Sequence, residues 1–86
     1  MTKYEALVNA QGVYAWAVLF GRGRLHELTN WSDEIGLNVH FPYSSFDRGR
    51  ENQKWRSVVM AGAEIKWEAR PDLQIWVLRI TWHFTE

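Results

Sequence analysis

The 86-residue sequence contains no cysteine. This absence excludes a disulfide framework, a thiolate nucleophile and a cysteine-based zinc site, and it fits a reducing compartment. A long hydrophobic run is also missing, because the longest one, residues 13–20, is far too short to cross a bilayer. The first residues do not resemble a secretory signal. We therefore expect a cytoplasmic protein without membrane contact.

An excess of charge of either sign is absent as well. Ten basic and ten acidic residues give a net charge of zero, which argues against a whole surface built to bind nucleic acid or an anionic membrane. The cations are nevertheless unevenly spread, and local basic patches are expected on a protein that is neutral overall. Six of the ten lie in two short segments: Arg22, Arg24, Arg48, Arg50, Lys54 and Arg56.

Aromatic residues, in contrast, are abundant, with six Trp, three Tyr and four Phe. A domain of this size buries only about 60% of its unfolded surface, so each large apolar side chain matters. Aromatic side chains bury about 150–250 Å² each and can fill a small core without disulfides or a metal. We expect one domain over residues 1–86, with some aromatic residues left exposed for binding.

The hydrophobic pattern predicts an all-β or β-rich α+β fold. We expect a single small antiparallel sheet or partly open barrel of about five to six strands, with one short helical turn. Residues 4–8 fit a helical face and a strand face equally, and we interpret them as a strand. Residues 13–20 are apolar on both alternating faces, which favours a central strand, with a buried helix as the alternative. Glycines 21 and 23 predict a tight reversal after this run.

The middle of the chain alternates between short elements. A short strand is expected around residues 25–28, and residues 29–36 predict about one turn of helix, since a polar cap and two acids precede a glycine. Residues 37–41 alternate between apolar and polar side chains, which predicts a strand that ends at Pro42. Residues 43–54 are the longest polar segment and are expected to form the main loop.

The C-terminal third predicts a β-hairpin of about residues 57–69 with 73–85. Apolar and polar residues alternate in both segments, and Pro71 suits a type I turn within a four-residue loop at 70–73. This loop sets the register and the two faces of the hairpin. The expected pairs are Ala69 with Gln74, Trp67 with Trp76, Ile65 with Leu78, Ala61 with Trp82, Val59 with Phe84 and, on the polar face, Glu64 with Arg79.

Metal and cofactor motifs are weak. The three histidines, His26, His40 and His83, are far apart and none has a second ligand at metal-type spacing. A two-histidine, one-carboxylate site with Glu27 stays open as an alternative, but we expect no metal. The two glycines after residue 20 lack the third glycine and the following helix of a dinucleotide-binding motif, so no cofactor is expected.

A catalytic hypothesis comes from the polar face of the last predicted strand. There His83 and Arg79 point the same way, as an acid/base group and a phosphate-stabilising group do in small ribonucleases. His40 from another strand is an alternative partner for His83. The competing interpretation is structural, because Arg79 already has Glu64 as an expected cross-strand partner. These three residues are therefore weak catalytic candidates.

The two arginine-bearing segments are the best candidate contact surface. Arginine binds carboxylate or phosphate through two hydrogen bonds and stacks on aromatic rings, which suits an acidic protein patch, RNA or single-stranded DNA. Ordinary solvated loops are the alternative, and the sheet order decides whether the two segments form one surface. The candidate binding residues are Arg22, Arg24, Trp31, Tyr43, Phe46, Arg48, Arg50, Lys54, Trp55 and Arg56.

The leading functional hypothesis is a small non-enzymatic protein that docks on another macromolecule, above all a protein, as an inhibitor, immunity or accessory protein does. Trp, Tyr and Arg are enriched at interface hot spots, and Trp31 and Trp55 look least committed to the core. The first alternative is binding of RNA or single-stranded nucleic acid through the arginine segments. The second is a small metal-independent ribonuclease. Exposed edge strands leave pairing with a second copy open.

Overall fold

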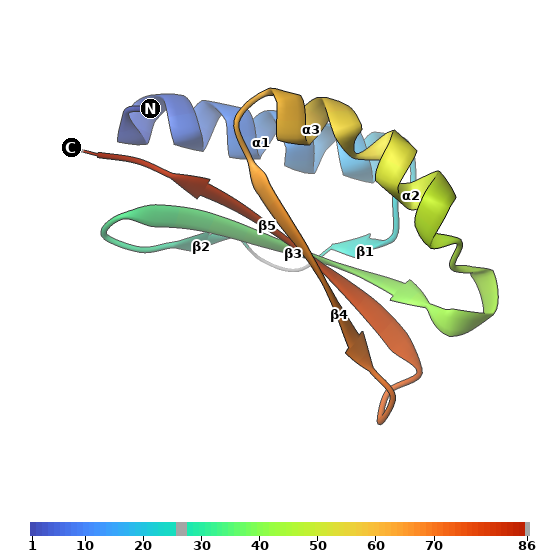
Figure 1. Cartoon of the computed structure of the whole chain (residues 1–86). Helices are drawn as coiled ribbons and strands as arrows, with labels where there is room; N and C mark the ends of the chain where they lie inside the picture. The colour runs from blue at the N-terminus through green and yellow to red at the C-terminus, as the bar shows by residue number, and fades with distance from the viewer. Residues whose placement is uncertain (26–27, 86) are drawn as a thin grey trace.

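The computed structural model describes residues 1–25 and 28–85. In these residues, three α-helices lie on one face of a five-stranded open antiparallel sheet (Figure 1). The predicted class, a β-rich α+β fold with a single antiparallel sheet, is confirmed. The elements are α1 (Lys3–Leu19), β1 (Arg24–Leu25), β2 (Thr29–Asn30), β3 (Glu34–Pro42), the 3₁₀ turn η1 (Tyr43–Ser45), α2 (Arg48–Lys54), α3 (Arg56–Met60), β4 (Glu64–Arg70) and β5 (Ile75–His83).

The sheet is centred on β3 and β5, which pair over their full length from Glu34 opposite His83 to Pro42 opposite Ile75. β4 pairs with the other edge of β5, while β1 and β2 share the other edge of β3. Alternate residues of the central strands face the helices and form the core. The most deeply buried of them are Ile35, Leu37, Val39, Leu78, Ile80 and Trp82.

Residues 3–19 form one long helix, so the strand interpretations of residues 4–8 and 13–20 are wrong. The helix begins with a capping box. The Thr2 hydroxyl accepts a hydrogen bond from the Glu5 amide, and the Glu5 carboxylate accepts one from the Thr2 amide, both at 3.1 Å. This bond from the Thr2 amide is the main reason why the pKa of the Glu5 carboxyl lies below its usual value.

The face of α1 that packs on the sheet is made of small residues. Ala6, Ala10 and Ala17 are buried and lie above one another, so the helix approaches β3 closely. The strand prediction failed because α1 is apolar on nearly all of its circumference, and alternation therefore matches a strand as well as a helix.

β4 and β5 form the predicted hairpin with the predicted faces, but their pairing is displaced by two residues. Trp67 lies opposite Leu78, and Lys66 rather than Glu64 lies opposite Arg79. The reason is that the loop covers residues 71–74 instead of 70–73. The Leu73 amide donates a hydrogen bond to the Arg70 carbonyl, and Gln74 is left-handed with φ 56°. In the same way Ala69 pairs with Trp76, and residues 57–60 belong to α3, not to a strand.

Three shorter predictions have mixed outcomes. The strand over residues 37–41 that ends at Pro42 is confirmed as part of β3. The helical turn over residues 29–36 is wrong, since β2 and the start of β3 occupy that stretch. The expected loop over residues 43–54 is largely helical, because Asp47 caps α2 by accepting a hydrogen bond from the Arg50 amide. Of the strand expected over residues 25–28, Leu25 belongs to β1, and residues 26 and 27 lie outside the described residues.

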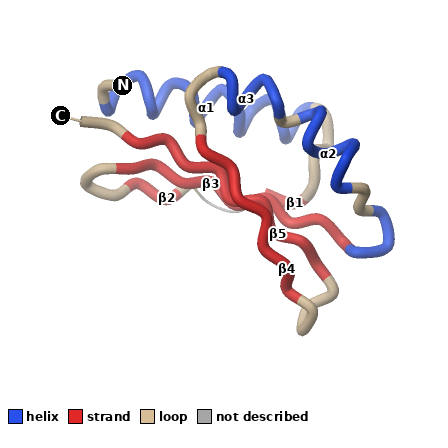
Figure 2. The backbone as a smooth tube through the Cα atoms, in the orientation of Figure 1, coloured by secondary structure: helices blue, strands red, loops and turns tan. Residues whose placement is uncertain are grey.

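The helices cover only one face of the sheet, and the tip of the β4–β5 hairpin extends beyond them (Figure 2). We call the uncovered side the open face. It carries the polar residues that alternate with the core residues, so the molecule presents two unlike surfaces, one helical and one of sheet.

Candidate functional site

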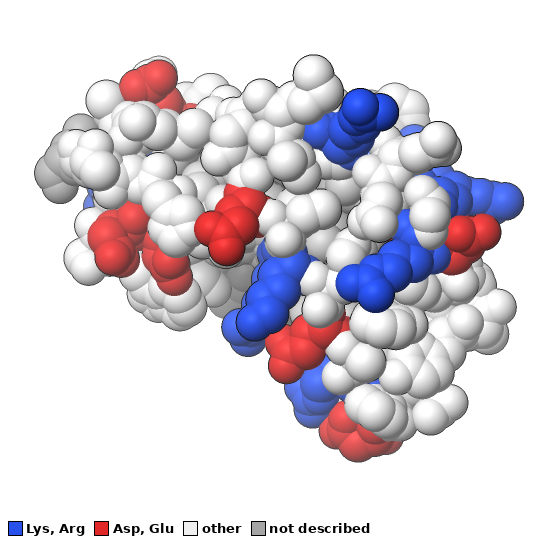
Figure 3. Space-filling view, viewed as in Figure 1, with Lys and Arg blue, Asp and Glu red and all other residues white. Residues whose placement is uncertain are grey.

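Cations gather at one end of the helical layer. Lys and Arg lie over α2 and the adjoining end of α3, whereas Asp and Glu of this face lie mainly over the opposite end (Figure 3). The turn that follows α1 reaches the same end, because β1 pairs with the last residues of β3, immediately before η1 and α2. We call this region the basic end, and its residues are Arg22, Arg48, Arg50, Lys54 and Arg56.

Gly23 fixes the path of the turn that carries Arg22. Its φ is +89°, and a Cβ atom there would lie 2.8 Å from Phe41 Cε1 and 2.9 Å from the His40 carbonyl oxygen. Only glycine fits such a conformation so close to β3. The turn is thereby held against the end of the sheet, and Arg22 is directed back toward α1. Its guanidinium carbon lies 5.3 Å from the ring centre of Trp16.

A pair of tryptophans joins the two arginine segments. Trp16 of α1 meets Trp55, between α2 and α3, edge to face with ring centres 5.1 Å apart. Arg22 packs on Trp16, and Trp55 is flanked in the chain by Lys54 and Arg56. The segments that are far apart in sequence therefore lie together at one end of the molecule.

Trp55 is a core residue. It is 0% exposed, and its ring also packs edge to face on Phe41. The expectation that Trp55 lies outside the core is therefore wrong. Its charged neighbours in the sequence suggested exposure, but the short helices on either side turn its ring inward while their cations face outward.

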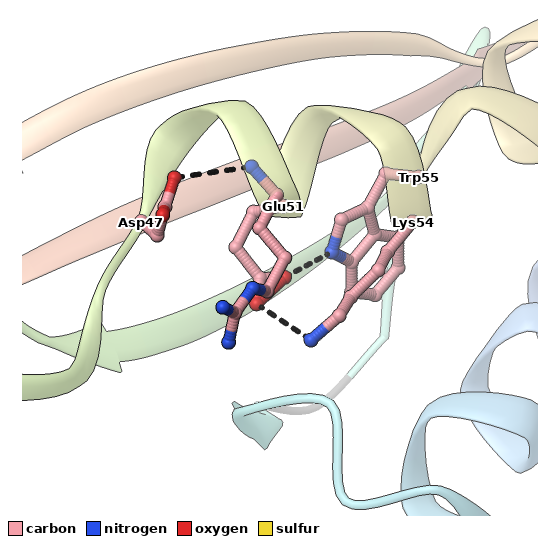
Figure 4. A network of polar contacts seen from close by, with 5 residues as sticks. Asp47, Glu51, Lys54 and Trp55 are labelled. Atoms are coloured by element: carbon pink, nitrogen blue, oxygen red, sulfur yellow. Dashed lines mark hydrogen bonds and ion pairs between the residues drawn. The ribbon is translucent and has the colours of Figure 1, made fainter.

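The acidic residues near the basic end are occupied by structural contacts (Figure 4). Asp47 caps α2, and the buried Glu51 carboxylate accepts hydrogen bonds from Lys54 Nζ at 3.4 Å and from Trp55 Nε1 at 3.3 Å. Among the described residues, no ion pair engages five of the cations. These unpaired cations are Arg22, Arg24, Arg48, Arg50 and Arg56.

Most aromatic rings near the basic end are covered. Phe46 packs against Trp67 and Trp76 with ring centres 5.0 and 5.4 Å apart, and Tyr43 lies 6.1 Å from Trp76. The Arg48 guanidinium also packs on this cluster, and its carbon lies 5.4 Å from the ring centre of Trp76. Tyr43 and Phe46, both predicted as binding residues, are therefore half-buried members of a cluster that anchors η1 and α2 to the hairpin.

Two predicted binding residues lie elsewhere. Trp31 is 57% exposed and follows β2, where it pairs with Glu34 at the acidic start of β3, far from the basic end. Arg24 lies opposite His40 in the β1–β3 pairing and so faces the open side of the sheet. There Arg24 and His40 line a hollow of about 430 Å³ together with Pro42, Leu73 and Ile75.

The weak catalytic candidates lie on the open face but do not assemble into one site. His40 and Glu34, the neighbour of His83, are six residues apart on β3, which separates the two histidines by about 20 Å. Both His83 and Arg79 have carboxylate neighbours instead. The contacts are His83 Nδ1 with Glu34 Oε2 at 3.5 Å, His83 Nε2 with Glu64 Oε2 at 3.1 Å, and Arg79 Nε with Glu68 Oε2 at 3.7 Å.

Sequence reasoning did not identify Trp16 and Glu51 as parts of this region. Trp16 was assigned to a strand. Its spacing of four residues from Phe20 is the helical signal, because it brings these two rings together beside Arg22. Glu51 was interpreted as a solvated loop residue. Its spacing of four residues from Trp55 on a short helix is the signal that was missed.

Two features are absent from the described part of the chain, a metal site and a membrane-spanning helix. Residues 1–25 and 28–85 hold no group of three or more metal-ligating side chains, and no helix within them is long and apolar enough to cross a membrane. His26 and Glu27, which belonged to the alternative metal site, lie outside the described residues. Comparisons with protein-family models, with curated proteins and with solved structures give no match for this chain.

Proposed function

We propose that the protein is a small non-enzymatic docking protein that binds an acidic surface of another protein through the basic end. The observation that carries this proposal is the contact between Trp16 and Trp55, which brings the two arginine segments together. Guanidinium groups bind carboxylates through two charge-assisted hydrogen bonds. Four such groups at the basic end, Arg22, Arg48, Arg50 and Arg56, have no carboxylate partner among the described residues, which suits an acidic surface on a target that the protein inhibits, neutralises or tethers.

The distribution of charge supports an oriented approach. The chain is neutral, yet cations predominate over α2 and acids predominate at the opposite end of the helical layer, while both signs alternate along β4 (Figure 3). A partner with an acidic surface attracts one end of this molecule and repels the other, which steers the encounter.

The arginines are also partly ordered before binding. Arg22 lies over the rings of Trp16 and Phe20, and Arg48 lies over Trp76. Cation–π contacts of this kind restrict the long side chains, so less conformational entropy is lost when a partner binds. Because Asp47 and Glu51 are already engaged within α2, they compete little for the guanidinium groups.

The aromatic surroundings favour an acidic protein over nucleic acid. Proteins that bind single strands offer aromatic ring faces on which bases stack. Here Arg22 covers Trp16, Arg48 covers Trp76, and Trp55 is buried. The basic end therefore offers cations without a row of free rings.

Affinity capture from a lysate of the source cells, after nuclease treatment, tests the proposal. The bait is the wild-type protein, the variant Arg50→Glu/Arg56→Glu, or the control Lys3→Glu/Lys66→Glu. All four side chains are exposed, and both variants change the net charge by the same amount. Glu is tolerated at positions 50 and 56 because each lies in the first turn of a helix, where the dipole favours negative charge.

We expect the wild-type protein and the control to retain one stoichiometric acidic protein, and the basic-end variant to bind it at least roughly tenfold more weakly. Equal capture by all three baits contradicts docking through the basic end. Loss of every partner after nuclease treatment, with binding of a labelled RNA oligonucleotide that weakens steeply with salt, identifies a nucleic-acid binder instead.

A further inference from the structure

The outer face of α1 is a second exposed surface, and it differs from the basic end because it is apolar. Residues 6–21 contain no charged side chain. On the side of α1 away from the buried alanines, Tyr4 is 74% exposed and Leu19 is 77% exposed, and Val8 and Val18 are exposed between them. Exposed apolar surface of this extent on a small protein marks an interaction site.

The exposed residues follow the spacing of a helix-packing seam. Steps of four, three, four and three residues lead along α1 from residue 4 to residue 18, which is the alternation of a coiled-coil interface. This line lies on the side of the helix opposite the stripe of buried alanines. We call it the α1 seam, and its members are Tyr4, Val8, Gln11, Ala15 and Val18, with Leu19 beside the last.

The area of the α1 seam and its flanks matches one side of a stable interface. The exposed parts of Tyr4, Tyr14 and Phe20 alone amount to roughly 300 Å². A helix of 17 residues is about 25 Å long, and its aliphatic residues bring the apolar surface to roughly the 600 Å² at the upper end for monomers. Specific interfaces begin at about 600 Å² on each partner, so the outer face of this helix reaches the lower end of that range.

We infer that a second copy of this chain covers the α1 seam, with the two helices antiparallel about a twofold axis near Gln11 and Gly12. Such an interface must be complementary to itself. In this arrangement Tyr4 faces Leu19 of the second copy, and Val8 faces Ala15. Large residues thus meet large residues at both ends, and Gln11 and Gly12 lie at the centre.

Two polar features fit the antiparallel pairing. Gln11 lies next to the twofold axis, so its amide meets the same amide of the second copy, and a single polar residue in an apolar seam fixes register. The last turn of α1 has no basic residue to offset the helix dipole, and the antiparallel partner brings its own N-terminal end to that place. Neither seam carries a charge that would repel its copy.

The alternative site for self-association, the free edge of β4, is less suitable. Glu64, Lys66, Glu68 and Arg70 are exposed along this strand. Charged side chains on an edge strand oppose pairing with another strand. We therefore assign self-association to α1 and not to the edge of the sheet.

Sedimentation equilibrium of the purified protein from about 1 µM to about 1 mM tests the inference. We expect the wild-type protein to dimerise within this range. Leu19→Glu should weaken the dimer at least roughly tenfold, because it places a charge in the seam. Leu73→Glu is the matched control, since Leu73 is also an exposed leucine, 57% exposed at the hairpin turn, and should leave the dimer intact. Circular dichroism checks that each variant is folded.

Cross-linking tests the direction of the pairing, and the absence of native cysteine makes it clean. Gln11→Cys lies near the axis and should form a disulfide-linked dimer on mild oxidation. Val8→Cys should not, because antiparallel helices separate the two copies of this residue by roughly 10 Å. Cross-linking of both variants overturns the antiparallel arrangement.

A monomeric protein at about 1 mM overturns the inference, and so does a dimer that Leu19→Glu leaves unchanged. Monomeric protein that co-sediments with vesicles of anionic and zwitterionic phospholipid assigns the α1 seam to a membrane surface instead. Because the basic-end variant leaves α1 unaltered, failure of dimerisation and failure of the proposed docking are separate results.

Discussion

The open face of the sheet and the helical face differ in how their polar groups are satisfied. On the open face, His83 lies between the carboxylates of Glu34 and Glu64, and Arg79 lies beside Glu68. On the helical face, the four arginines of the basic end have no ion-pair partner among the described residues, and α1 exposes an apolar seam. Charged side chains of the open face thus contact one another across the strands, whereas the helical face has cations and apolar side chains without such contacts.

This difference places the expected interactions on the helices. Cross-strand ion pairs on an exposed sheet contribute little stability but occupy the charges that a ligand would need. The guanidinium groups of the basic end form no such ion pairs. They can therefore bind another molecule without breaking an internal ion pair.

The largest expected effect is on stability, and it compares the buried Trp55 under the helical face with the exposed Trp31 after β2. Trp55→Ala removes a fully buried ring that packs on Trp16 and Phe41, and should lower the free energy of unfolding by about 3–5 kcal/mol. Trp31→Ala removes an exposed ring and should change it by less than about 0.5 kcal/mol. Urea denaturation measures both. Equal effects would show that the helical face does not depend on Trp55.

The same two tryptophans show what the sequence could predict about the site. The arginine segments were found because basic residues cluster visibly in the sequence. Their meeting through Trp16 and Trp55 was not predictable, since it depends on the position of α1 above β3 and on the order of the strands. Trp55 was predicted as exposed because its neighbours in the sequence are polar. The sequence does not show that its ring points into the core between α2 and α3.

The fold was predictable where one face of an element is polar. The faces of β4 and β5 were right because charged and apolar residues alternate, while the register failed by two residues because Pro71 allowed more than one loop. α1 was not predicted because its outer face is apolar, so the sequence lacks the polar face that identifies a surface helix. The residues of this apolar outer face form the α1 seam. Thr2 and Glu5, a capping box, were the local signal that was overlooked.

A second effect tests the turn after α1, which carries Arg22 and which Gly23 allows to lie against the sheet. Gly23→Ala should destabilise the protein by about 1–3 kcal/mol, since φ is +89° and the added Cβ would contact Phe41 and Val39 at 2.8 Å. Gly12→Ala, within α1 and with open space around it, should instead stabilise the folded chain by about 1 kcal/mol. Thermal unfolding measures the two shifts, and shifts of the same sign would refute this account of the turn.

A smaller effect is expected from the open face. Replacing His83 by Ala removes one contact with the half-buried Glu34 and one with the exposed Glu64, and should change the free energy of unfolding by less than about 1 kcal/mol. Capture of the acidic partner should be unchanged. Loss of the partner in this variant would move the binding surface to the sheet and reverse the comparison between the two faces.

The smallest effect concerns the hairpin tip. A hydrogen bond from Arg70 holds the pKa of the Asp72 carboxyl below its ordinary value of 3.8. A depressed pKa means that this contact stabilises the fold at neutral pH and that the contribution is lost as the pH falls through the lowered pKa. In an NMR titration Arg70→Gln should return the Asp72 midpoint toward 3.8, and an unchanged midpoint would contradict this cause.

The most direct test of the central claim is an NMR titration of the isotope-labelled protein with the acidic protein recovered in the capture experiment. We predict that the largest amide shift changes occur at residues 22–24 and 48–56, with little change at residues 64–70 and 79–83. The reverse pattern, with the largest changes on β4 and β5, would contradict docking through the basic end.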